Sequence, residues 1–307
     1  MNNDWQLDLR PLRYFVCVAE EKSLTKAAER LHVAQPALSR QMQKLEAALA
    51  TELFIRSARG VELTKAGDIL LSRAYLIFNQ IQQTVNDVTS QADRPQGVVT
   101  VGMPPTPGEF IAPVLLERIK AHYPEIELRF LEGFSSVLAQ KLANNEISIA
   151  VMHGPEPSSD MTITELLVER LWVIGAAGTL DRASYTLAEA AALPLILPSR
   201  PNFLRILIDS HAEREKLTLN VVQRSDGIGH TKALVRFGHG QTILTYGAVL
   251  SEMQQGTLDT APITDPQIDW TLYVAMRRDQ SRKPAYRVVS EAIREIVRDL
   301  VNRSIWK

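Results

Sequence analysis

Residues 23–46 read SLTKAAERLHVAQPALSRQMQKLE, and this stretch predicts two helices joined by a short turn. Ser23 can cap the first helix, because a serine oxygen accepts hydrogen bonds from the free N–H groups of a first turn. After a break at residues 32–34, Gln35 and Pro36 look like the cap and first-turn residues of a second helix. This layout is that of a helix-turn-helix DNA reader.

Small and apolar residues allow the two helices to cross closely. Ala27 and Ala28 keep the first helix slim, and apolar residues at the turn fill the wedge between the helices. On the second helix an apolar stripe recurs at helical spacing, which is typical of a face packed on a core. The wedge and stripe residues are Leu31, Val33, Leu38, Met42, Leu45 and Leu49.

The outer face of the second helix carries side chains suited to a DNA groove. Glutamine can pair with an adenine edge, arginine can take two acceptors on guanine, and serine suits a phosphate or a base edge. No acidic residue lies between Val33 and Lys44, although the 10 Lys and Arg of residues 1–66 barely exceed their 8 Asp and Glu. The alternative is that the stripe is simply the solvated face of a helix. The face comprises Gln35, Pro36, Ser39, Arg40, Gln43 and Lys44.

Further elements are predicted on both sides of this pair. Residues 11–21 have the apolar period of a helix, and residues 53–63 hold two short apolar runs around a turn, which predicts a β-hairpin. In a winged reader such a hairpin reaches the adjacent backbone or minor groove, and Arg56 and Arg59 lie on it.

A long helix is predicted after the hairpin. Thr64 is a suitable cap, and from Leu70 to Val88 the stripe recurs every 3.5 residues on average. A helix of about 40 Å is too long for one small neighbour, so we expect it to pair with another chain. The alternative is a connecting helix that packs on its own domain.

The rest of the chain alternates short apolar runs with helical patterns after a polar break at residues 91–97. Such alternation predicts parallel sheets covered by helices. Strands are expected at 98–103, 126–131, 147–152, 171–174, 195–197, 219–223, 242–244 and 272–276.

Composition limits the class of protein. The 307 residues include 34 Lys and Arg and 35 Asp and Glu, so a nucleic-acid site must be local. Cys17 is the only cysteine, which excludes an intramolecular disulfide and fits a reducing compartment. No apolar run approaches the ~20 residues of a membrane span, and the opening lacks the features of a secretion signal. We therefore expect a cytoplasmic protein with no membrane partner.

Residues 23–46 resemble the N-terminal signature of LysR-type transcriptional regulators, and residues 53–67 match the family's wing and linker-helix start. The resemblance implies a multi-domain α/β fold with a winged helix-turn-helix over 1–66 and a dimerising linker helix over 67–95. A two-lobed effector-binding domain, which resembles periplasmic binding proteins, would follow over 96–307. Its lobes would comprise about 96–169 with 269–307, and about 170–268, with crossings near 168–171 and 268–270.

The resemblance implies a sequence-specific DNA-binding regulator that responds to a small effector and is not an enzyme. Its partners would be double-stranded DNA with a palindromic operator, a small molecule for which an anion is one candidate, and a second copy of the chain. The resemblance also implies a tetramer, with RNA polymerase as a further candidate partner. No cofactor is expected. The expected DNA contacts are Ser23, Gln35, Pro36, Ser39, Arg40, Gln43, Arg56 and Arg59.

Candidate effector residues lie where strands are expected to end. Clefts of α/β sheets lie beyond the carboxyl ends of strands, where helix N-termini offer free N–H groups. Hydroxyl residues occur at several such ends, and Arg200 is placed to neutralise an anion. The alternative is that each Ser or Thr is a plain helix cap. The candidates are Pro105, Thr106, Ser135, Ser136, Ser199, Arg200, Asn202, Thr245 and Tyr246. By the resemblance, the loops at Thr106, Ser135 and Ser199 hold the inducer.

Two other functions fit parts of the chain. An enzyme would explain the glycines at 227–229 and 238–240, but Lys232 and Ile243 stand where a third glycine is needed. A solute receptor for transport fits the last two-thirds but not the first third. The histidines expected at surface or capping positions are His153, His230 and His239.

Overall fold

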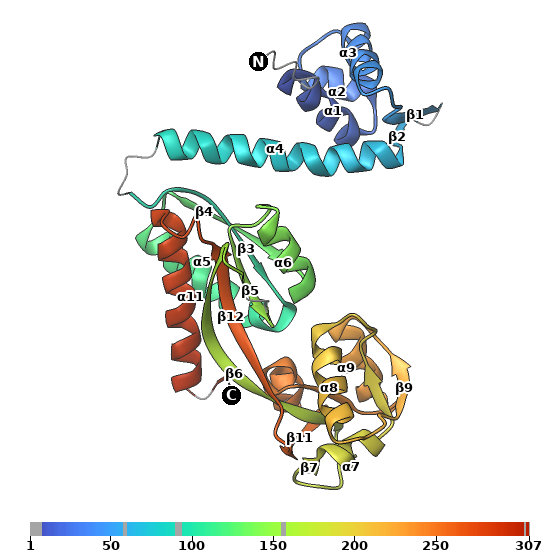
Figure 1. The fold of residues 1–307 in the computed structure, drawn as a ribbon, viewed down its shortest axis with the longest axis vertical. Helices are drawn as coiled ribbons and strands as arrows, with labels where there is room; N and C mark the ends of the chain where they lie inside the picture. The colour runs from blue at the N-terminus through green and yellow to red at the C-terminus, as the bar shows by residue number, and fades with distance from the viewer. Residues whose placement is uncertain (1–7, 58–59, 90–93, 155–157, 304, 307) are drawn as a thin grey trace. The chain divides into compact units, whose positions relative to one another are not determined.

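The computed structural model describes residues 8–57, 60–89, 94–154, 158–303 and 305–306 (Figure 1). The chain divides into two compact units, Met1–Thr89 and Ser90–Lys307. None of the helices in this described part has the length and apolar character needed to cross a membrane.

The first unit is a helical domain with a two-stranded hairpin. In chain order it contains α1 (Leu9–Glu21), α2 (Leu24–Arg30), α3 (Gln35–Ala48), β1 (Phe54–Ser57), β2 (Gly60–Leu63) and α4 (Lys65–Thr89). Its core joins the inner faces of the helices to the hairpin, as the rings of Phe15 and Phe54 illustrate with their centroids 5.1 Å apart. The apolar stripe Leu38, Met42 and Leu45 of α3 is buried in this core.

The start of α3 differs from the expectation by one residue. Ala34, and not Gln35, is the N-cap, because the Ala34 carbonyl already accepts the Leu38 N–H at 3.1 Å. Gln35 and Pro36 are therefore the first two helical residues, and no side chain caps α3.

Helix α4 uses its apolar residues on two different faces. Leu70, Ala74 and Phe78 pack on the core of the first unit, whereas Ile77 and Val85 are exposed. The expected single stripe is therefore divided, because the straight helix cannot keep a 3.5-residue period on one face. The side chain of Val88 lies outside the described residues.

The second unit contains two lobes, which we define by their separate hydrophobic cores. Lobe I is built from β3 (Gly97–Met103), α5 (Pro105–His122), β4 (Ile126–Glu132), α6 (Ser135–Ala143), β5 (Ile149–His153), β12 (Asp269–Arg277) and α11 (Pro284–Asn302). Lobe II is built from β7 (Tyr185–Thr186), α7 (Leu187–Ala192), β8 (Leu195–Leu197), α8 (Phe203–Arg214), β9 (Val221–Arg224), α9 (Ile228–Arg236), β10 (Thr242–Thr245), η1 (Tyr246–Val249), α10 (Leu250–Gln254) and β11 (Leu258–Asp265).

Strand β6 (Met161–Ala176) joins the two lobes (Figure 1). Its first part pairs with β12 from Met161 to Arg170, and its last part pairs with β10 and β11 of lobe II. The chain returns to lobe I where the Leu171 N–H donates to the Ile268 carbonyl at 3.1 Å. The two lobes therefore meet at one pair of strands.

The large sheet is mixed, which corrects the expectation of parallel sheets. Among the described residues its order is β4-β3-β5-β12-β6-β11-β7, and β10 also pairs with β6. Strand β3 is parallel to β4 and β5, but β12 is antiparallel to both β5 and β6. A strand that leaves a lobe and a strand that returns to it run in opposite directions, so the crossing itself imposes this arrangement.

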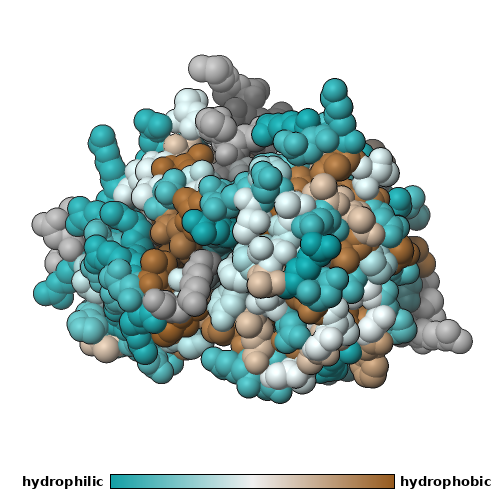
Figure 2. Space-filling view, turned by 90° about the horizontal axis from the view of Figure 1, so that it is seen from below, coloured by the Kyte–Doolittle hydropathy of each residue, from teal (hydrophilic) through white to brown (hydrophobic). Residues whose placement is uncertain are grey.

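Hydrophobic side chains are concentrated in the cores rather than on one large surface. Figure 2 shows one face of the molecule, which is mostly hydrophilic and carries its hydrophobic residues in separate patches. Such small patches are ordinary for a folded protein surface.

Gly67 offers a test of how α4 is fixed to the hairpin. A methyl group at this position would lie 2.8 Å from Leu63 Cδ2 and even closer to the Leu53 carbonyl oxygen. We expect Gly67→Ala to lower the free energy of unfolding by about 1–3 kcal/mol, the usual cost of overpacking. Urea unfolding of the full chain measures the free energy of unfolding. The matched change Gly229→Ala, also in a helix, meets no atom within 4 Å and should leave stability unchanged or raise it by up to about 1 kcal/mol, because alanine favours a helix over glycine. A comparable loss of stability in both variants would contradict the packing described.

Candidate functional site

The outer face of α3 is exposed as the sequence predicts. Gln35, Pro36, Arg40 and Gln43 are exposed, together with Lys44, and Ser39 is half-buried. Among the described residues no hydrogen bond or ion pair engages the side chains of Arg40, Gln43 or Lys44. This face is therefore a polar, acid-free surface with side chains available to a partner.

Acidic groups near α2 are engaged in the scaffold. Arg30 donates to Glu20 at 2.7 Å and to Glu21 at 3.0 Å, and these hydrogen bonds raise the pKa of Arg30. The Tyr75 hydroxyl on α4 donates to Glu20 at 2.9 Å, and burial together with this bond raises the pKa of Tyr75. These contacts join α1, α2 and α4, so they fix the frame that presents α3.

The hairpin is attached to the end of α3. Glu46 Oε1 accepts the backbone N–H groups of Leu53 at 2.9 Å and Phe54 at 3.2 Å. Arg56 belongs to β1, but its side chain and the whole of Arg59 lie outside the described residues. Glu46 therefore sets where the wing begins relative to α3.

Ser23 acts as a helix cap in this structure. Its hydroxyl accepts the Lys26 N–H at 3.4 Å, and the residue has extended backbone angles at the start of α2. Sequence reasoning predicts this cap, and a contact from Ser23 to DNA would have to be made in addition to it.

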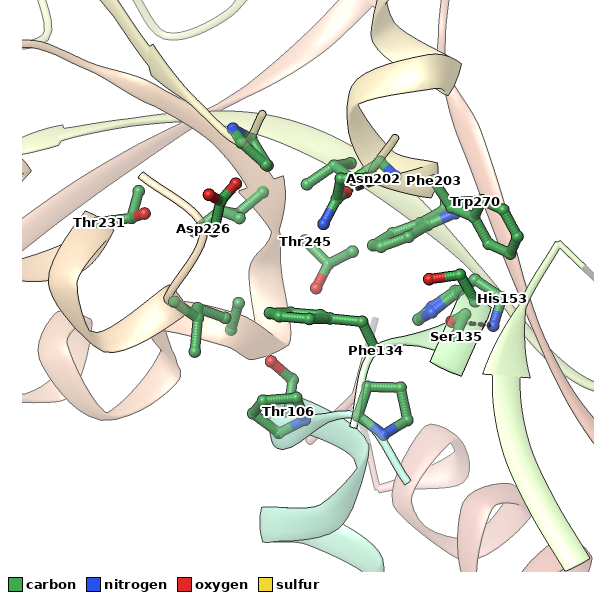
Figure 3. Close-up of a pocket in the computed structure, with 18 of the residues that line it drawn as sticks. Thr106, Phe134, Ser135, His153, Asn202, Phe203, Asp226, Thr231, Thr245 and Trp270 are labelled. Atoms are coloured by element: carbon green, nitrogen blue, oxygen red, sulfur yellow. Dashed lines mark hydrogen bonds between the residues drawn. The ribbon is translucent and has the colours of Figure 1, made fainter. Parts of the chain in front are cut away.

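The second unit contains a cavity of about 320 Å³ between its lobes (Figure 3). Its walls are the carboxyl ends of strands and the starts of the helices that follow them, which is the place where α/β sheets bind ligands. Eight of the nine effector candidates line it: Pro105, Thr106, Ser135, Ser136, Ser199, Arg200, Asn202 and Thr245. Tyr246 is not among the lining residues, because it begins η1 and turns toward Trp172, with ring centroids 5.3 Å apart.

Several of these candidates already serve the fold. Asn202 caps α8 by accepting the Leu204 N–H at 2.9 Å, and the Ser199 N–H donates to Asp226 at 2.7 Å. Arg200, a candidate to neutralise an anion, lies 2.6 Å from Asp209, and the same carboxylate also pairs with Arg205 at 2.9 Å. One carboxylate thus faces two guanidinium groups, and a role for Arg200 toward an anion stays a prediction.

Other polar groups at the cavity have no partner. The side chains of Thr106, Ser136 and Thr245 make no hydrogen bond among the described residues, and Thr245 is 96% buried, since only 4% of it is exposed. Figure 3 shows the Phe134 ring between Thr106 and Thr245, with the hydroxyls of both threonines directed toward it. Both lobes thus present hydroxyl groups to the same space.

Helix starts add backbone donors to the cavity wall. Helices α5, α6 and α9 begin at the cavity and lack a side-chain cap, whereas α8 is capped by Asn202. Uncapped first-turn N–H groups and the helix dipole favour an electronegative group. The arrangement is chemically suited to hold a small molecule with such a group.

Sequence reasoning missed two buried ionisable residues of the cavity. His153 and Glu169 line it, with only 3% and 1% of their surfaces exposed, and Trp270 stacks on the His153 ring at 3.7 Å between centroids. The expectation of a surface or capping role for His153 is therefore wrong. Strand β5 ends at His153, one residue later than predicted, so the rule that strand ends line clefts would have found it.

Comparison with known proteins identifies families for both units. The model of the bacterial regulatory helix-turn-helix protein, lysR family, matches residues 9–68. The model of the LysR substrate binding domain matches residues 92–298. Together these matches extend over both units.

The chain is similar to transcriptional regulators, and the similarity extends over nearly the whole length of both proteins. The nitrogen assimilation regulatory protein nac of Escherichia coli is 31% identical over 95% of this chain and 95% of that protein. The HTH-type transcriptional regulator BbuR of Bordetella bronchiseptica is 28% identical over 98% of this chain and 93% of that protein.

Solved structures share the fold. A full-length OxyR variant from Pseudomonas aeruginosa has a TM-score of 0.65 and 26% identity, with 94% of this chain and 97% of that chain covered. Full-length CbnR complexed with target DNA has a TM-score of 0.72 at 22% identity, with 94% and 100% covered, a likeness that concerns the fold alone. The chain belongs to the LysR family: it is a transcriptional regulator that binds DNA through a helix-turn-helix and carries an effector-binding domain.

Proposed function

We propose that the outer face of α3 lies in the major groove of an operator and reads its base pairs. The observation that carries this proposal is the exposed, acid-free face on which Arg40, Gln43 and Lys44 have no partner among the described residues. Arg40 suits the two acceptors of a guanine, and Gln35 or Gln43 suits an adenine edge.

We propose that phosphate contacts accompany base reading by α3. Pro36 and Ser39 lie near the uncapped start of α3, where backbone N–H groups suit a phosphate, and Ser23 lies at the start of α2. Arg56 and Arg59 belong to the hairpin segment, from which they would reach the adjacent backbone or minor groove.

The proposed active form is a dimer through α4, with a tetramer built from two dimers. Ile77 and Val85 are large apolar residues exposed on this helix, and because they are eight residues apart they lie on one side of it. Pairing two α4 helices would cover them and place two reading heads on the half-sites of a palindrome. The same proposal puts the regulator in the cytoplasm, with access to operators and RNA polymerase.

The proposed effector is a small molecule with an electronegative or anionic group. Its binding is supported by the uncapped starts of α5, α6 and α9 and by the unpartnered hydroxyls of Thr106 and Thr245. Thr106 belongs to lobe I and Thr245 to lobe II, so a ligand that touches both would favour a closed arrangement about β6 and β12.

We propose that this cavity binds its ligand without catalysing a reaction. Ser135 is the hydroxyl residue next to His153, but its Oγ accepts the backbone N–H of His153 at 3.0 Å. The imidazole Nε2 faces Glu169 at 3.1 Å instead of the serine. These contacts do not form the nucleophile and base pair that covalent catalysis requires.

Arg40→Ala tests base reading by α3. After an operator has been obtained by binding-site selection, we expect this variant to lose about 5- to 150-fold of its preference for that operator over scrambled DNA. This loss corresponds to the ~1–3 kcal/mol of one bidentate base contact. Competition binding measures the preference, and Arg13→Ala, an exposed arginine on α1, is the matched control. Unchanged selectivity in Arg40→Ala would refute its role as a base reader.

Arg56→Ala separates phosphate binding from base reading. A phosphate contact contributes equally to every sequence, so affinity should fall to the same extent for the operator and for scrambled DNA. The slope of log affinity against log salt should become shallower by about 1, because one phosphate is no longer neutralised. Titrations of DNA binding at several salt concentrations, with the operator and with scrambled DNA, measure the loss of affinity and the slope. A flat salt response of the unmodified protein would contradict ordinary duplex binding.

A further inference from the structure

Three buried polar side chains form a chain of hydrogen bonds where the lobes meet. Trp306 Nε1 donates to Glu169 Oε1 at 2.7 Å, and His153 Nε2 lies 3.1 Å from Glu169 Oε2. Glu169 belongs to β6 next to the crossing, and His153 ends β5. None of the three exposes more than 3% of its surface, so water does not compete for these bonds.

Donor and acceptor rules fix the direction of the chain. An indole N–H can only donate, so Glu169 Oε1 accepts. With Glu169 as a carboxylate, Oε2 also accepts, and His153 must hold a hydrogen on Nε2. In the neutral form of the ring, the lone pair is then on Nδ1, which acts as an acceptor. Trp306 and Glu169 are thus positioning residues that select one tautomer of His153.

The other ring nitrogen of His153 is left for a ligand. Nδ1 has no hydrogen-bond partner among the described residues, and His153 lines the cavity while being 3% exposed. A molecule that donates a hydrogen bond to this acceptor therefore gains affinity over one that does not. Figure 3 shows the imidazole between Ser135 and Trp270 on the cavity wall.

Aromatic side chains determine what shape of molecule fits beside His153. Trp270 covers one face of the imidazole at an interplanar angle of 14°, and Phe134 and Phe203 add two further rings to the wall. A cavity of about 320 Å³ with such walls suits a ligand built on a single ring.

We propose that His153 determines effector specificity, and that the effector is a ring compound with a hydroxyl or amino group that donates to Nδ1. This inference rests on the proposed use of the cavity as the effector site. The effector would then need two groups: an electronegative group held by the helix starts, and a hydrogen-bond donor that faces His153.

The tautomer of His153 can be tested without any ligand. In nitrogen-15 NMR of the full-length chain with labelled histidine, we expect the His153 ring to carry its hydrogen on Nε2. In Glu169→Gln, the amide oxygen can still accept from Trp306, but the amide N–H donates to Nε2, so the hydrogen should move to Nδ1. Hydrogen on Nδ1 in the unmodified protein, or no change in the variant, would overturn the proposal.

Two probes of the same skeleton test the ligand class. We expect 1-phenylethanol, which donates a hydrogen bond, to bind the full-length protein about two- to tenfold more tightly than acetophenone, which only accepts. That ratio is the usual contribution of one neutral hydrogen bond. His153→Phe keeps a ring against Trp270 but removes Nδ1, and it should abolish the difference. Glu169→Gln should abolish it too, whereas the matched change His239→Phe at an exposed position should preserve it.

The outcomes distinguish this inference from the proposed function. Equal binding of both probes to the unmodified protein would overturn the role of His153 while leaving the cavity as a binding site. Failure of both probes to bind would overturn the ring-compound class and count against the cavity as the effector site. Neither result bears on DNA reading by α3, which the operator measurements test separately.

Discussion

The pairing of β6 with β12 is the constraint on which the second unit depends. The two strands are hydrogen-bonded from Met161 to Arg170, after which β6 continues into lobe II and pairs with β10 and β11. Because the lobes share this one pair of strands, the space between them is bounded by fixed strand ends on both sides. Glu169 and Trp270 lie at the crossing, so the deepest part of the cavity is also the place where the lobes are joined. A molecule bound there would therefore lie next to the strands that join the lobes.

In the first unit, the contacts hold α3 so that one polar face of this helix stays exposed. The apolar side of α3 packs on α1 and the hairpin, while Glu46 at its end holds the Leu53 and Phe54 N–H groups. Arg30 and Tyr75 converge on Glu20 and join three helices around α3. Every one of these contacts uses groups away from the outer face. The outer face of α3 is therefore exposed because the contacts that stabilise the first unit do not involve it.

Local patterns predicted the parts of the structure that depend on local chemistry. The cap at Ser23, the buried stripe of α3 and most strands of the second unit follow from spacing and residue type. The direction of β12 did not follow, because a single strand carries no information about its partner's direction. The pairing of Arg200 with Asp209 was missed for a similar reason, since the sequence shows a cation but not the acid that faces it. His153 was missed because a one-residue error in a strand end moves a side chain from a loop to a cavity wall.

We propose that the outward face of α3 reads bases in the major groove. Methylation interference on a selected operator tests this most directly, because a methyl group on guanine N7 blocks the acceptor that an arginine would use in that groove. We expect methylation of at least one guanine in each half-site to prevent binding of the full-length protein. Binding that is indifferent to every guanine N7 methyl group, but sensitive to modified phosphates, would contradict it.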